Sequence, residues 1–230
     1  MTRENVMTKI ATISLESTDT DWLRVRFVIC VAIYGAAIGV ATILVNFLVR
    51  ADAISLPQHR PLWTSLLFSG AAAVAGITIT GPAAYWIFGT RHVFSTVEKR
   101  KPRSLIVWIV LGFGYGIAFP LLMGAYFLPL SFYFHDFASG LTSAPQLVSR
   151  VFDVVLIWPV LALVFGNGLF FTGLIAGALF GSGGWIIDRF NASTSLTTAK
   201  YGTWIMSMLL SIAVIATVIV VPETILARLG

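Results

Sequence analysis

Five long stretches of this sequence contain no Lys, Arg, Asp or Glu and consist mostly of apolar residues. A membrane-crossing helix needs about 20 such residues, because the hydrocarbon core is roughly 30 Å thick. Inside lipid every backbone N–H and C=O group must be paired within the protein, and a helix achieves this by itself. The stretches therefore predict five transmembrane helices. The predicted spans are 27–49, 62–89, 105–126, 154–180 and 203–221.

The composition excludes the usual soluble classes. Charged residues make up 11% of the chain, hydrophobic residues make up 57%, and the mean hydropathy is +0.89. Soluble domains carry about 25% charged residues, and disordered chains carry few apolar ones. We therefore predict an all-α integral membrane protein, a bundle of about five transmembrane helices. Its transmembrane domain covers 27–222, between an N-terminal tail at 1–26 and a short C-terminal tail at 223–230.

A short interfacial helix is predicted just before the fourth span. Ser143 and Gln146 match a capping box, and apolar residues follow at helical spacing. Arg150 and Asp153 stand three residues apart and are expected to pair on this helix. The third apolar run continues past its predicted span, and we interpret 127–134 as an aromatic extension at the interface.

Basic residues predict the orientation. Of the 15 Lys and Arg residues, 11 fall in the N-terminal tail and in the second and fourth connections. Because basic residues are retained on the cytoplasmic side, we expect a cytoplasmic N-terminus in a bacterial inner membrane. The basic connection at 91–103 is expected to contact anionic lipid headgroups, and nucleic acid is not an expected partner. All formal charges are assigned to tails or connections, which predicts a bundle without buried charge.

Small residues at four-residue spacing predict the helix-packing faces. Helices in lipid gain little from hydrophobicity, so close approach at small residues becomes an attractive contribution. The pattern leaves open whether these faces meet each other, another subunit, or a flat lipid or pigment. The predicted packing residues are Gly35, Gly39, Ala72, Gly76, Gly112, Gly116, Gly173, Gly177, Gly181, Ser207 and Ser211.

The sequence predicts no catalytic, metal or cofactor site. Each of the three histidines is assigned to a connection or a span end, and no His or Cys pair has zinc-ligand spacing. Ser182 stands among glycines, but the G-x-S-x-G order is missing, so 181–184 is interpreted as a flexible helix end. His135 and Asp136 are adjacent in the sequence, and a membrane enzyme that uses these two residues at the interface is a minor hypothesis.

Two main hypotheses for function follow. The first is a non-catalytic membrane subunit or scaffold that packs into a larger complex through its small-residue faces, with other membrane proteins as partners. The alternative is a small permease, channel or lipid-handling protein. Its pathway would pass Asn167, Thr172 and Tyr115, polar residues within the predicted spans.

Overall fold

The protein is a bundle of long helices. The computed structural model describes residues 22–45, 62–94, 102–160, 167–193 and 197–229. Within these residues, five helices are long and apolar enough to cross a membrane, which confirms the predicted fold class. The spans are Trp22–Val45, Leu67–Phe88, Leu105–Ala138, Phe171–Asn191 and Thr198–Val220.

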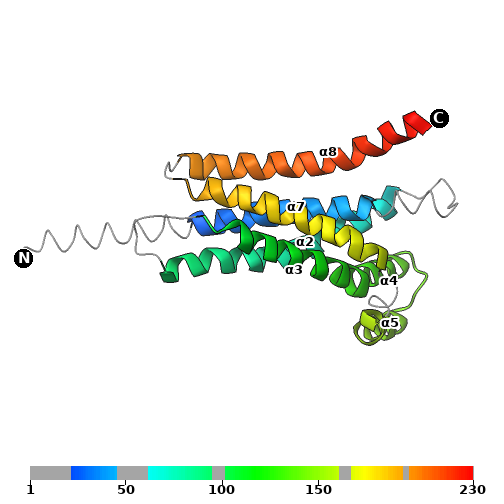
Figure 1. Ribbon diagram of the computed structural model, residues 1–230. Coiled ribbons are helices and arrows are strands. Elements are labelled where there is room, and N and C mark those ends of the chain that lie inside the picture. The colour runs from blue at the N-terminus through cyan, green and yellow to red at the C-terminus, as the bar shows by residue number, and fades with distance from the viewer. Residues whose placement is uncertain (1–21, 46–61, 95–101, 161–166, 194–196, 230) are drawn as a thin grey trace, which may run out of the picture.

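These spans lie side by side, and the last described helix ends at the opposite end of the bundle from the start of the first described helix (Figure 1). Trp22–Val45 is called the first span below. The later elements are α2 (Leu62–Phe94), α3 (Leu105–Leu122), the π-helix η1 (Met123–Phe127), α4 (Leu128–Ala138), α5 (Ala144–Leu156), α7 (Asn167–Asn191), the π-helix η2 (Thr198–Gly202) and α8 (Thr203–Leu229).

The first span packs closely against α2 through small residues. A Cβ on Gly39 would overlap the carbonyl group of Ala72, and a Cβ on Gly76 would overlap the carbonyl group of Gly35. Only small residues allow two helix backbones to approach so closely. The small-residue faces of these two helices therefore meet within the chain.

A second close pair joins α3 to α7. A Cβ on Gly112 would overlap the carbonyl oxygen of Gly177, and a Cβ on Gly173 would overlap that of Gly116. Gly181 lies in the same way against the carbonyl group of Trp108. The glycine faces of α3 and α7 thus also pack against each other inside the bundle.

The third span is one long helix with a widened turn. The interfacial extension predicted at 127–134 is helical and continues through α4 to Ala138. In η1 the hydrogen-bond spacing lengthens, and the Leu128 N–H donates to the Met123 carbonyl oxygen. Pro129 follows directly, and its ring would clash with the carbonyl group four residues earlier in a regular α-helix. The proline thus explains the π-helical turn.

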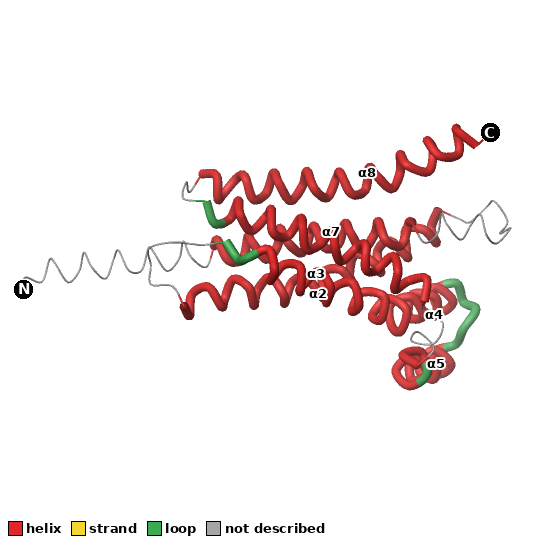
Figure 2. Tube along the Cα trace, viewed as in Figure 1, coloured by secondary structure: helices red, strands yellow, loops and turns green. Residues whose placement is uncertain are grey.

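The predicted short helix is α5, which lies across one end of the bundle after a short loop at 139–143 (Figures 1 and 2). At its start, the Gln146 side chain accepts a hydrogen bond of 3.0 Å from the Ser143 N–H. The expected pair of Arg150 and Asp153 is wrong. Arg150 instead reaches Asp136 of α4 at 3.1 Å, because α5 packs against α4 on that side.

The fourth span lies later in the chain than predicted. The prediction was 154–180, but α5 ends at Leu156 and α7 extends from Asn167 to Asn191. The flexible helix end expected at 181–184 is wrong as well, because these residues are helical. Gly183 packs on the Tyr34 ring and Gly184 on the Trp108 ring, so the glycines accommodate large neighbours within a continuous helix.

Aromatic rings from the first span, α3 and α7 fill the centre of the bundle. Tyr115 stacks on Phe119 and on Phe180, with ring centroids 5.4 Å and 5.0 Å apart. Phe27 meets Trp108 edge to face at 6.4 Å. Such pairs contribute about 0.5–1.5 kcal/mol each beyond the area that they bury. They join the first span, α3 and α7 into one core.

Replacing Gly112 by Ala is expected to lower the free energy of unfolding by about 1–3 kcal/mol, because the new methyl group would force α3 away from the Gly177 carbonyl group. Denaturation by SDS in mixed micelles measures this change. The control is Gly114→Ala on the same helix, which meets nothing within 4 Å and should leave the stability nearly unchanged. Equal losses in the two variants would contradict the packing described above.

Candidate functional site: a cleft between α7 and α8

The residues predicted to line a pathway do not come together. Tyr115 is buried in the aromatic core, where its hydroxyl donates to the Gly35 carbonyl oxygen at 3.1 Å. Thr172 lies instead on the wall of a cleft between α7 and α8. The Asn167 side chain falls outside the described part of the structure, although its backbone begins α7. Tyr115 does not line the cleft that contains Thr172, so the structure does not bring these two residues together along one pathway.

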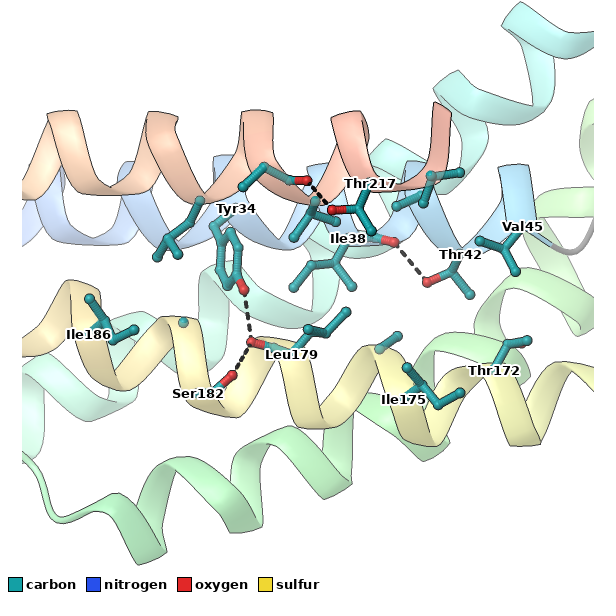
Figure 3. A pocket seen from close by; sticks show the side chains of 17 residues that line it. Tyr34, Ile38, Thr42, Val45, Thr172, Ile175, Leu179, Ser182, Ile186 and Thr217 are labelled. Atoms are coloured by element: carbon teal, nitrogen blue, oxygen red, sulfur yellow. Dashed lines mark hydrogen bonds between the residues drawn. The ribbon is translucent and has the colours of Figure 1, made fainter. Parts of the chain in front are cut away.

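The cleft is formed by the divergence of two helices. Figure 1 shows α7 and α8 close together near the 192–202 connection and separating away from it. The first span forms the floor between them (Figure 3). The cavity has a volume of about 360 Å³. Mostly aliphatic side chains line it, among them Ile38, Ile175, Leu179, Leu210 and Val214.

Hydroxyl groups supply most of the polarity of the cleft, and four of the five donate their protons to helix carbonyl groups. Tyr34 donates to the Leu179 carbonyl oxygen at 2.8 Å, and Ser182 donates to the same oxygen at 3.1 Å (Figure 3). Thr42 and Thr217 each donate at 2.7 Å to a carbonyl one turn earlier in their own helix. A hydroxyl has a single proton to donate, so these four groups offer a ligand only acceptor positions.

One end of the cleft is closed by contacts of α8 with the first span. The Ser207 hydroxyl donates to the Cys30 carbonyl oxygen at 2.7 Å. Closer to the helix end, the Arg26 guanidinium donates at 2.7 Å to the Ala199 carbonyl oxygen in η2. Ser211, the other predicted packing residue of α8, donates within its own helix to the Ser207 carbonyl oxygen. Beyond these contacts the cleft opens, and Leu210, Val214 and Val218 of α8 line it.

The same end of the bundle contains buried charge, which the sequence analysis placed outside the spans. That prediction is wrong for Arg26 and Asp188, which are both buried within helices. Asp188 Oδ2 accepts hydrogen bonds from the backbone N–H of Arg103 at 2.8 Å and from the indole N–H of Trp108 at 3.1 Å. These donors offset part of the cost of burying the carboxylate. The uncharged residues that continue past Phe180 as far as Ile187 were the signal that α7 extends this far.

Asn191 lies one turn beyond Asp188 and is also buried. Neither its amide nitrogen nor its amide oxygen has a hydrogen-bond partner among the described residues. The connection predicted to bind headgroups, 91–103, lies mostly outside the described part of the chain, because 95–101 are not described. Its role therefore stays a prediction.

The minor enzyme hypothesis stays a prediction, although one of its two residues, Asp136, belongs to an ion pair. Asp136 accepts from Arg150, and the His135 carbonyl oxygen accepts from the Ser139 N–H at the end of α4. No group of three or more His, Cys, Asp or Glu side chains capable of holding a metal ion occurs among the described residues. The cleft combines a lining from three helices with a few polar groups, and we therefore take it as the candidate ligand site.

The chain matches no family model, no curated protein and no solved structure.

Replacing Asp188 by Ala is expected to destabilise the bundle, since two donors lose their acceptor at a cost of about 1–3 kcal/mol each where they are buried. Asp188→Asn keeps one oxygen acceptor and should cost less. Thermal unfolding in detergent measures both changes. Asp153→Ala on α5 is the control, because it removes an equal charge from an exposed position. A loss at Asp153 as large as that at Asp188 would contradict the assignment.

Proposed function

We propose that this protein is a non-catalytic membrane protein that holds a hydrophobic molecule of the bilayer in the cleft between α7 and α8. This is the lipid-handling alternative of the sequence analysis, with the pathway moved from the aromatic core to the cleft. Ligand sites typically enclose about 300–1,000 Å³ and are lined mostly by apolar groups with a few polar ones. The cleft, at about 360 Å³, falls within that range.

The single observation that carries the proposal is the direction of the hydroxyl protons. Tyr34, Thr42, Ser182 and Thr217 donate to helix carbonyl groups, as described above. A polar solute that moves from water into the cleft would meet mostly aliphatic side chains and four hydroxyl groups that can only accept, so it would lose most of its hydrogen bonds at a cost of several kcal/mol. A hydrocarbon has no such bonds to lose. The lining therefore favours a lipid over a sugar, an amino acid or an ion.

A membrane subunit is the second candidate. Its original basis, small-residue faces that bind other proteins, is weakened because these faces are used within the chain. What favours it now is the outer surface of α3, where large apolar side chains form a continuous exposed face. That face contains Ile106, Ile109, Val110, Phe113 and Ile117. Lipid covers such a face equally well, so a partner must be found before this candidate is preferred.

Lipid retention tests the proposed function. We expect particles extracted in mild detergent to carry bound lipid in native mass spectra, and Ala213→Trp to reduce that lipid severalfold by filling the cleft. The control is Ala216→Trp, because Ala216 is also exposed on α8 but does not line the cleft. Equal lipid retention in the two variants would refute the cleft as the site. A stoichiometric protein partner in the same spectra would favour the subunit instead.

The proposed orientation places the N-terminus in the cytoplasm of a bacterium, with the basic connection at 91–103 against anionic headgroups of the inner membrane. In a Cys30→Ala background, a membrane-impermeant maleimide added to whole cells should label Ser139→Cys and leave Ser104→Cys unlabelled. Both residues are exposed, and they stand at opposite ends of the third span. Labelling of Ser104→Cys alone would reverse the orientation.

A further inference from the structure

On the first span and on α8 the lining of the cleft occupies one half of the bundle along its axis, whereas on α7 it extends from Thr172 to Ile186. On the first span its lining begins at Tyr34, near the middle of Trp22–Val45, and ends at Val45. At about 1.5 Å per residue this stretch is roughly 16 Å long, about half of a hydrocarbon core of roughly 30 Å. The lining of α8 is confined to the same half, since it begins at Leu210, just after the Ser207 contact.

The cleft is blind toward the middle of the membrane. Tyr34 packs on Gly183 and donates to the Leu179 carbonyl oxygen, which ties the first span to α7 at this level. One turn further along, Ser207 ties α8 to the Cys30 carbonyl oxygen. A molecule in the other half of the membrane would have to break these contacts to reach the cleft. The occupant must therefore come from the half that contains Val45.

The other boundaries of the cleft are open. Ile175 and Leu179 on α7 are exposed on one wall, and Ala213 and Thr217 on α8 are exposed on the other. Because the walls of this slot are exposed outer surfaces of transmembrane helices, the slot opens sideways into lipid. An acyl chain can thus move in from the side without crossing the bundle.

The cleft is small and apolar. Its volume of about 360 Å³ lies near the lower end of the range typical of ligand sites, and aliphatic side chains supply most of its lining. A single extended hydrocarbon chain suits such a lining.

We infer that the cleft binds one acyl chain of a phospholipid from the half of the membrane that contains Val45, with the methyl end of the chain at Tyr34. This inference rests on the proposed function and specifies its ligand. The chain lies along the helix axes, its methyl end meets the blind wall at Tyr34 and Leu210, and its glycerol end lies near Val45 and Val218.

Two photoreactive phospholipids test this arrangement in vesicles that contain the full chain. One carries a diazirine at the methyl end of an acyl chain, and the other carries it close to the glycerol. Peptide mass spectrometry should find the methyl-end probe severalfold enriched around Tyr34, Ile186 and Leu210. The glycerol-end probe should be enriched around Val45 and Val218.

The controls separate this inference from the proposed function. Ala213→Trp should suppress cleft labelling by both probes, while Ala216→Trp should leave it unchanged. Reversed labelling, or equal labelling of both ends by both probes, would overturn the inferred half of the membrane while cleft labelling still supported lipid binding. No cleft labelling by either probe, together with no lipid in native mass spectra, would overturn the proposed function itself.

Discussion

Direct contact between helix backbones is the interaction on which this bundle depends. Lipid tails are as apolar as the side chains that they meet, so hydrophobicity cannot hold transmembrane helices together. Here the glycines of α3 and α7 bring the two backbones together, and Gly76 with Gly39 does the same for α2 and the first span. Everything else is arranged around these two pairs. The aromatic core fills the space between them, and α8 joins the bundle from outside.

The attachment of α8 explains why a cleft exists. The two close pairs use glycine along much of their contact, whereas α8 has Ser207 and Ser211 followed by larger side chains such as Leu210 and Val214. Polar contacts of Arg26 and Ser207 hold one end of α8. Past these contacts its large side chains keep the helices apart. Among the described residues, the buried charges Arg26 and Asp188 lie at the end of the bundle opposite the opening of the cleft.

The spans could be predicted from the sequence because the membrane imposes a length and an uncharged composition on each of them. Asp188 was wrongly predicted to lie outside the spans. A carboxylate at the end of a span looks the same in the sequence whether water or an indole N–H donates to it. The helix past Phe180 was missed because a run of glycines usually indicates a flexible segment. Here Gly183 and Gly184 are needed for another reason, since only glycine leaves room for the Tyr34 and Trp108 rings. The cleft depends on how far α7 and α8 diverge, which no local pattern encodes, so Thr172 was identified without its neighbours.

The hydrogen bond from the Tyr115 hydroxyl to the Gly35 carbonyl oxygen spans the two glycine-packed pairs, since Tyr115 belongs to one and Gly35 to the other. Gly35 also contacts Gly76 and Thr80, so its peptide group in the first span borders both α2 and α3. A displacement of α3 therefore also displaces α2, because both helices contact the Gly35 peptide group, although each helix has its own glycine face. Energetic effects of changes in the two pairs will be non-additive, and the bundle will lose its order as one cooperative unit.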